Sequence, residues 1–171
     1  SSIESIKIIT DNKTQIISMI SSFEGTSNLQ SFNMSGFIIN KLKSIKKLFY
    51  KSNIQNINLS LFKEAENIED LSYVFASSKV EKIDLSPLNT ENVIDMSYMF
   101  YNCSSLIILD VTPLNTTNVE NMSHIFDGCE SLQEIDPSKF NTSKVKDMSY
   151  MFCNCTYLLN LELFNFDVTY V

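Results

Sequence analysis

The sequence predicts an α/β fold of the leucine-rich-repeat type, a solenoid in which about seven short strands form a concave parallel sheet and short helices or helical turns cover the convex side. Two observations lead to this prediction. An apolar triplet in the pattern L-x-x-L-x-L, such as Leu106, Leu109 and Val111, returns along the chain. A landmark phenylalanine precedes it at intervals of 25 or 26 residues. Its copies are Phe23, Phe49, Phe75, Phe100, Phe126 and Phe152.

The triplet is the predicted strand. Because side chains alternate between the two faces of a strand, Leu109 and Val111 are expected to point inward, and Ile108, Asp110 and Thr112 outward. Equivalent outward residues of successive repeats then form columns across the sheet.

The segment before the landmark phenylalanine has the apolar spacing of a short helix. In one repeat the apolar positions are Val93, Met96, Met99 and Phe100. Asn92 and Asp95 stand where a helix N-cap and an acidic residue of the first turn would satisfy free amides. This segment is therefore predicted to be the convex helix.

The chain is predicted to be a single leucine-rich-repeat domain over residues 1–171, with 25- to 26-residue repeats that are degenerate in 1–53 and regular in 54–171. Both ends stop in phase with the repeat, which favours a segment of a longer array. A degenerate native cap is the alternative. No apolar run approaches the length of about 18 residues that spans a membrane, and the chain does not open like a signal peptide.

Three segments carry a resemblance to a known family. They are NTENVIDMSYMFYNCSSLIILDV, NTTNVENMSHIFDGCESLQEID and NTSKVKDMSYMFCNCTYLLNLEL. They resemble the bacterial surface-antigen (BspA-like) class of leucine-rich repeats, which is also described as a mollicute surface-lipoprotein repeat. The resemblance implies a surface or secreted protein that acts in adhesion, host-protein binding or co-aggregation.

Charge is unevenly distributed along the chain, whose net charge is -7. The part through Glu64 carries +4 and the remainder -11, and arginine is absent. The basic cluster is Lys41, Lys43, Lys46, Lys47 and Lys51. It fits either a nucleic-acid or anionic-surface patch or a solvated face. The lack of arginine and of interleaved aromatic residues favours the solvated face, so no nucleic-acid partner is expected.

Four carboxylates form the middle outward column of the predicted sheet, and we call them the acidic column. Its members are Asp84, Asp110, Asp136 and Glu162. Ile108 and Glu134 lie in the adjacent outward column and join the candidate partner-binding residues. Stacked like charges are unfavourable, so the column either engages a basic partner or is a soluble strand pattern whose charges water relieves.

A second column, the aromatic column, lies two residues before the landmark phenylalanine. Its members are Tyr73, Tyr98, His124 and Tyr150. Half-exposed tyrosines suit contacts with protein or sugar, although aromatic residues of this kind often cover the edge of a core. His124 has no nucleophile or ligand set in the sequence and is not expected to be catalytic.

Cysteines recur three residues after the landmark phenylalanine, as Cys103, Cys129 and Cys155. A thiol metal site or redox pair is one interpretation. Small buried hydrophobic residues are the favoured one, because serine or threonine takes the position in other repeats. Cys153 is off this register and is expected to be exposed.

The sequence therefore predicts a non-catalytic binding module that needs no metal and no cofactor, because it contains no phosphate loop, no Cys-x-x-Cys pair and one histidine. The expected partner is a protein of a host or neighbouring cell, with carbohydrate as a further candidate and no direct membrane insertion. The alternative is a cytoplasmic role, as an intracellular scaffold, the targeting arm of a larger multidomain protein, or a structural assembly component.

Overall fold

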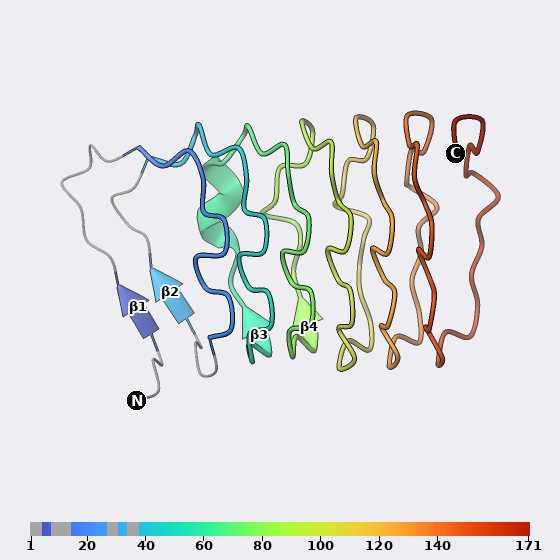
Figure 1. The fold of residues 1–171 in the computed structure, drawn as a ribbon, viewed down its shortest axis with the longest axis horizontal. Helices are drawn as coiled ribbons and strands as arrows, with labels where there is room; N and C mark the ends of the chain where they lie inside the picture. The colour runs from blue at the N-terminus through green and yellow to red at the C-terminus, as the bar shows by residue number, and fades with distance from the viewer. Residues whose placement is uncertain (1–4, 8–14, 27–30, 34–37) are drawn as a thin grey trace.

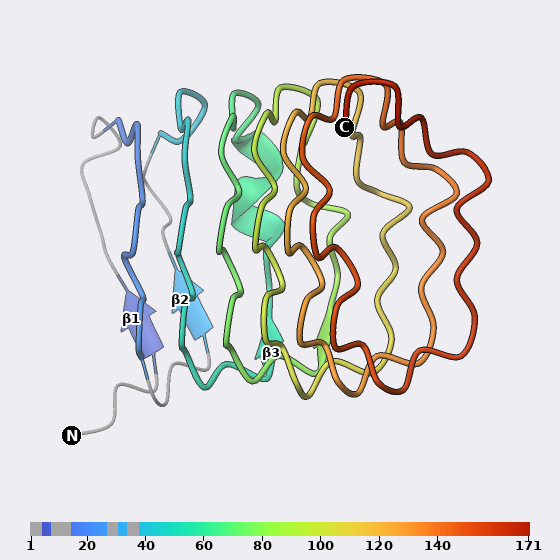
Figure 2. The same ribbon diagram turned by 45° about the vertical axis from the view of Figure 1, so that its right-hand side comes forward.

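A computed structural model describes residues 5–7, 15–26, 31–33 and 38–171, with side chains for 15–26 and 38–171. In Figure 1 the described chain forms a row of similar loops that lie side by side along the longest axis, from the early residues in blue to the C-terminus in red. Figure 2, turned by 45°, shows the later loops as open rings with two long sides.

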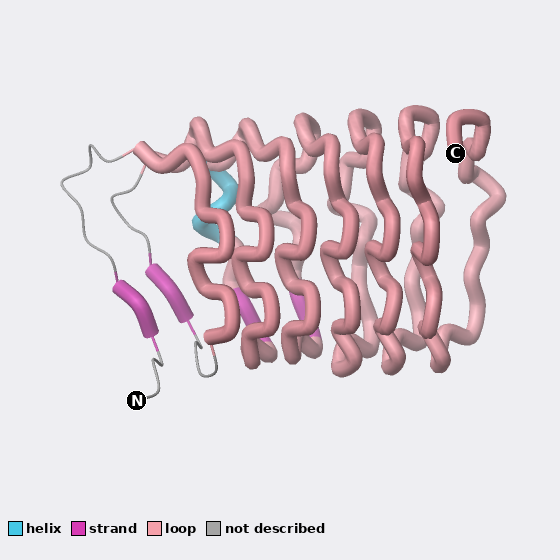
Figure 3. The backbone as a smooth tube through the Cα atoms, in the orientation of Figure 1, coloured by secondary structure: helices cyan, strands magenta, loops and turns pink. Residues whose placement is uncertain are grey.

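Regular secondary structure is sparse. Strand β1 (Ser5–Lys7) pairs in parallel with β2 (Ser31–Asn33), and β3 (Asn56–Ile57) pairs in parallel with β4 (Lys82–Ile83). A 3-10 helix, η1 (Ser60–Glu64), follows β3. The remaining described residues are turns and loops, drawn in pink in Figure 3.

The predicted fold class is wrong. In the described ranges, two separate two-stranded sheets replace the expected concave sheet of about seven strands. The expected convex helices do not form either, since η1 is the one helical element among the described residues. The strand predicted from Ile3 to Ile8 and the apolar positions Leu29 and Met34 lie partly or wholly outside the described residues.

Loops are joined by hydrogen bonds between segments that surround the landmark phenylalanine, and we call residues 95–102 and their equivalents the turn segments. Alternate amides of one turn segment donate to alternate carbonyls of the next. The donors Met96, Tyr98, Phe100 and Asn102 reach the carbonyls of Asn121, Ser123, Ile125 and Asp127 at 3.0, 2.9, 2.9 and 2.7 Å. The same direction holds at each described junction, from Met19 donating to Ser44 through Met122 donating to Asp147.

The turn segments alternate in backbone hand, which prevents a helix. Residues two before and two after the landmark phenylalanine have positive φ, as at Tyr98 (58°) and Asn102 (56°). A non-glycine residue rarely takes this left-handed conformation, and it never propagates as a helix of L-residues. With this backbone every second amide points outward, toward the neighbouring loop.

Side chains also draw the backbone away from a helix. Asp95 Oδ1 accepts a hydrogen bond from the Ser97 amide at 2.8 Å, and this local bond offers the backbone an alternative to helix formation. Asn92, the predicted cap, instead donates from Nδ2 to the Glu66 carbonyl of the preceding loop at 3.1 Å. A segment of about two helical turns is also too short to be a stable helix without such competition.

The core is a ribbon of apolar side chains whose buried members run from Met19 to Met151 among the described residues. Successive landmark phenylalanines stack with ring centroids 5.4 to 5.9 Å apart and nearly parallel planes. The residues whose spacing suggested a helix, Val93, Met96, Met99 and Phe100, are all fully buried. The apolar periodicity thus identified the buried face correctly, although not the backbone that carries it.

Two glycines occupy the left-handed position after the landmark phenylalanine and allow a matched test. A Cβ at Gly128 would lie 3.1 Å from the Asn102 Cα, whereas a Cβ at Gly25 would meet nothing within 4 Å. We expect both Gly128→Ala and Gly25→Ala to cost about 1 kcal/mol for the left-handed backbone, and Gly128→Ala to cost more because of the backbone contact. Urea denaturation of the two variants measures the difference, and equal losses would contradict the close packing of these loops.

Candidate functional site

The acidic column lies on an exposed surface of the row. Asp84, Asp110, Asp136 and Glu162 are all exposed. Asp110 sits between buried Leu109 and buried Val111, so the alternation expected of a strand is kept even where no strand is formed. The apolar neighbours anchor the backbone and leave the carboxylate in solvent.

Three of the four carboxylates cap local turns. The Oδ1 atoms of Asp84, Asp110 and Asp136 each accept a hydrogen bond at 2.9 Å from the amide two residues ahead. Hydrogen bonds from Ser86 and Ser138 lower the pKa of Asp84 and Asp136 below the ordinary value of 3.8. The pattern D-x-S/T, an Asx-turn signal, is present in the sequence and could have revealed this structural role.

One groove gathers four of the predicted partner-binding residues. Ile108, Asp110, Glu134 and Asp136 line it, and its volume is about 350 Å³. Ile108 and Glu134 also face each other in a parallel bridge between consecutive loops. Ile108 is 59% exposed, so an apolar side chain stands among three carboxylates. We call this the acidic groove.

Other predicted residues lie apart from the acidic groove. Asp84 and Glu162 belong to the same column but do not line it. Ile107, which the sequence analysis did not select, is an exposed neighbour of Ile108. No signal in the sequence pointed to it, because the alternation that places Leu109 and Val111 inward would place Ile107 inward as well.

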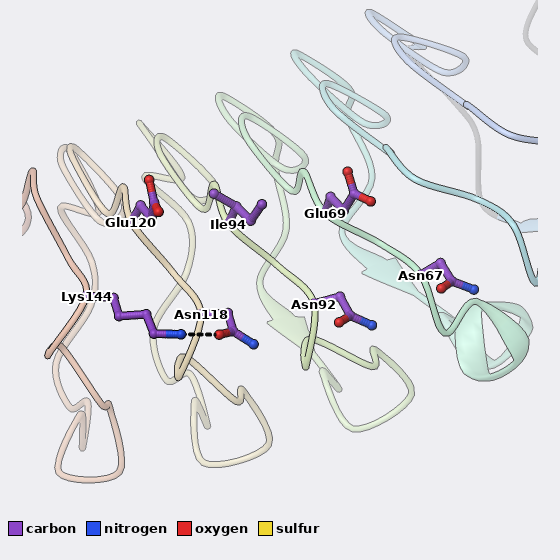
Figure 4. Close-up of a pocket in the computed structure, with 7 residues that line it drawn as sticks. All are labelled: Asn67, Glu69, Asn92, Ile94, Asn118, Glu120 and Lys144. Carbon is purple, nitrogen blue, oxygen red and sulfur yellow. Dashed lines mark hydrogen bonds between the residues drawn. The ribbon is translucent and has the colours of Figure 1, made fainter.

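A second groove was missed by the sequence analysis. Figure 4 shows its lining residues: Asn67, Glu69, Asn92, Ile94, Asn118, Glu120 and Lys144. Its volume is about 390 Å³. Each of its asparagines comes from a different loop and directly precedes a buried residue, Ile68, Val93 or Val119. The recurrence of asparagine at this repeat position is the sequence signal that could have predicted the groove.

The polar groups of this second groove are largely engaged in contacts with one another or with residues beside the groove. Asn118 donates from Nδ2 to the Glu91 carbonyl at 2.8 Å and accepts from Lys144 Nζ at 2.6 Å. Glu69 pairs with Lys43 at 2.6 Å, and Glu120 pairs with Lys146 at 2.7 Å. These contacts join neighbouring loops, so the main role of the groove residues is to stabilise the packing of one loop on the next.

The aromatic column is a continuous stack. Ring centroids are 4.4 Å apart from Tyr73 to Tyr98, 4.4 Å from Tyr98 to His124 and 4.7 Å from His124 to Tyr150, with planes within 11° of parallel. Interior ring faces therefore cover one another and are closed to a ligand. Tyr150, which is 63% exposed, and the ring edges remain available for contact.

His124 has a carboxylate partner that the sequence did not indicate. Its Nδ1 lies 2.8 Å from Oδ2 of Asp127, which is only 7% exposed and accepts a hydrogen bond from Asn154 Nδ2 at 3.1 Å. The arrangement holds one ring of the aromatic column in place. Across the described ranges no group of three or more His, Cys, Asp or Glu side chains is placed to hold a metal ion.

Basic and aromatic side chains meet at one end of the aromatic column. The Nζ atoms of Lys47 and Lys51 lie 5.4 and 4.9 Å from the centroid of Tyr50. The Nζ atoms of Lys46 and Lys47 lie 6.0 and 5.5 Å from the centroid of Tyr73. The prediction that the lysine cluster lacks interleaved aromatic residues is wrong. Phe49 and Tyr50 lie between Lys47 and Lys51 in the sequence, and Tyr73 of the next loop joins the cluster in space.

The recurring cysteines occupy the core edge. Cys103 and Cys129 are buried, Cys155 is half-buried, and each Sγ donates to the carbonyl of the landmark phenylalanine one loop earlier at 3.1 Å. Burial raises the pKa of Cys103 to about 12 and that of Cys155 to about 11, and it raises the pKa of Cys129 further. Cys153 is half-buried rather than exposed.

Comparison with protein families decides the assignment of the chain. A family model described as "Mycoplasma protein of unknown function, DUF285" matches residues 5–86 and 69–171. The chain belongs to this family. Comparison with curated proteins and with solved structures gives no significant match.

The DUF285 family is of the mollicute type that the resemblance implied. In the part of this DUF285 chain that the structure describes, no helix has the length and apolar character needed to cross a membrane.

The raised thiol pKa values predict selective reactivity. At pH 8 in the native protein, we expect a thiol-specific reagent such as Ellman's reagent to modify Cys153 first and to leave Cys103 and Cys129 unmodified, because protonated, buried thiols are poor nucleophiles. In denaturant all four thiols should react. Cys153→Ser should abolish the fast phase, and a fast phase that survives this substitution would contradict the assignment.

The turn-capping role of the acidic column predicts how its substitution affects stability. Asp110→Asn and Asp136→Asn keep the Oδ1 acceptor and remove like charge, so we expect an unchanged or raised Tm at pH 7. Asp136→Ala removes the acceptor and should lower the Tm. Because the pKa of Asp136 is lowered in the folded state, its stabilisation is present above pH 3.8 and is lost as the pH falls through the folded pKa. The difference in Tm between wild type and Asp136→Ala should therefore become smaller in acid. Thermal unfolding measured from about pH 2 to about pH 7, which spans the ordinary pKa of an aspartate, tests this.

Proposed function

We propose that the chain is a non-catalytic binding module that recognises a protein through the acidic groove. The observation that carries the proposal is the exposed Ile108 side chain among the carboxylates of Asp110, Glu134 and Asp136. An apolar contact ringed by charge is the usual form of a small protein-binding centre, because the apolar group supplies affinity and the rim supplies specificity.

The expected partner presents a basic segment with an apolar residue. Asp110 and Asp136 already accept hydrogen bonds from their own turns, and these bonds hold the carboxylates in fixed positions. Lysine or arginine side chains can approach the remaining oxygen lone pairs without rearrangement of the loop. Preorganisation of this kind lowers the entropic cost of binding.

The cellular setting is proposed from resemblance. Segments from Asn89, Asn115 and Asn141 resemble the repeats of BspA-like bacterial surface antigens, and the match to a Mycoplasma family is compatible with this origin. We therefore propose a surface or secreted protein that contacts a host or neighbouring cell. Antibody labelling of intact and permeabilised source cells tests this location; signal only after permeabilisation would favour the intracellular scaffold.

Selection from a phage-displayed library of short peptides tests the binding chemistry. We expect the selected peptides to combine lysine or arginine with an apolar residue. Their affinity should fall by about tenfold or more for the triple variant Asp110→Asn, Glu134→Gln, Asp136→Asn, since a tenfold change corresponds to about 1.4 kcal/mol. Ile108→Ser should weaken binding without changing its salt dependence.

The matched control neutralises three exposed acids elsewhere, Glu64, Glu66 and Glu91, and removes the same net charge. Its affinity for the selected peptides should stay close to that of the wild type. Selection of acidic peptides, or equal losses in the two triple variants, would refute the proposed groove.

A further inference from the structure

The cluster formed by Lys46, Lys47, Lys51, Tyr50 and Tyr73 is a second surface with its own chemistry, and we call it the basic-aromatic corner. Lys47 lies over both rings, at 5.4 Å from the Tyr50 centroid and 5.5 Å from the Tyr73 centroid. Contact with ring faces holds an ammonium group in place by cation–π attraction and restricts its long side chain. Three positive charges are thus held close together at the surface.

These three charges have no carboxylate partner in the described ranges. The ion pairs found there join Lys43 to Glu69, Lys146 to Glu120 and His124 to Asp127. Between Glu24 and Glu64 the sequence contains six lysines and no acidic residue. In a chain of net charge -7, a basic surface left without internal partners is available to an external anion.

Nearby carboxylates limit the reach of this surface. Asp70 accepts hydrogen bonds from Ser44 Oγ at 3.3 Å and from the Ser72 amide at 2.9 Å. Burial raises the pKa of Tyr73 most, and the phenols of Tyr98 and Tyr50 and, least, the carboxylate of Asp95 raise it further. An anionic ligand is therefore drawn to the lysine end of the aromatic column and repelled from its middle.

Ring geometry excludes stacking of nucleic-acid bases. The Tyr73 ring stacks on Tyr98 at 4.4 Å and carries two lysines, while Tyr50 packs edge-on to Tyr73 at 6.1 Å and carries Lys47 and Lys51. Single-stranded nucleic acid binds proteins largely by stacking its bases on open aromatic faces. The groups left for a ligand here are ammonium N–H donors and phenol hydroxyls, which suit oxygen-rich anions.

We propose that the basic-aromatic corner binds an acidic polysaccharide through its sulfate or carboxylate groups. The ammonium groups of the three lysines engage the anionic groups, and the tyrosine hydroxyls donate to or accept from sugar hydroxyls. This site is separate from the acidic groove and its partner, so either can fail without the other.

Binding of fluorescent heparin, polygalacturonate, neutral dextran and a single-stranded oligothymidylate to the chain tests the proposal. We expect heparin or polygalacturonate to bind at low salt with an affinity that falls as salt rises, and dextran not to bind. Preference between the two polyanions identifies sulfate or carboxylate as the recognised group.

Variants separate this corner from general charge. Lys46→Gln, Lys47→Gln, Lys51→Gln should lower polyanion affinity by about tenfold or more, whereas Lys63→Gln, Lys79→Gln, Lys139→Gln, with the same charge change at other exposed sites, should leave it nearly unchanged.

Tyr50→Leu keeps every lysine but removes a ring that positions two of them, and should also weaken binding. Tyr50→Phe keeps the ring and should retain most of the polyanion affinity. Circular dichroism checks that each variant is folded. If the triple variant is not folded, the binding measurement uses Lys51→Gln alone, because this position is exposed.

The proposal is overturned if neither polyanion binds, if dextran binds equally, or if the two triple variants lose the same affinity. Oligothymidylate binding as tight as heparin, and competing with it, would assign the corner to nucleic acid instead.

Discussion

The hydrogen-bond ladder between consecutive turn segments is the constraint on which the rest of the structure depends. Its amides point to the next loop because residues two before and two after each landmark phenylalanine have positive φ. The ladder sets the distance between loops. That distance in turn brings the phenylalanine rings into a stack, places the aromatic column at 4.4 to 4.7 Å spacing, and aligns the polar columns on the outer surface.

Apolar periodicity in the sequence was enough to predict which side chains are buried, but not the backbone that buries them. Val93, Met96, Met99 and Phe100 fit a helical face because four residues in eight positions do not distinguish a helix from consecutive turns of mixed hand. The deciding signals were local and polar. Asp95 before Ser97, and Asn or Gly after the phenylalanine, favour turns and left-handed residues, and they outweigh the weak helix propensity of so short a segment.

The candidate sites were likewise predictable only in part. Columns of equivalent residues could be predicted from the repeat length, so the exposed positions of Asp110 and Asp136 and the proximity of Ile108 to Glu134 followed from the register. Contacts between different columns could not. Lys47 and Tyr73 occupy the same position in consecutive loops, two residues before the landmark phenylalanine, and this brings the ammonium group over the ring. The spacing of residues along the chain does not say how far each side chain extends.

The bonds between turn segments give the row a partial electrical polarity. At each described junction the alternate amides of one turn segment donate to carbonyls of the next, so the dipoles of these bonds add. Bonds that lie before the turn segments, such as those from the Glu120 amide to the Ile94 carbonyl and from the Lys146 amide to the Glu120 carbonyl, point the opposite way and offset part of this field. The partial positive pole faces the later loops and the partial negative pole the earlier ones, as in an α-helix read in reverse. The side-chain charges complement this field: lysines predominate through Glu64, and acidic residues predominate after it. The uneven charge of the sequence therefore has the sense that the field of the turn segments favours, in addition to deciding what the surfaces of the row attract.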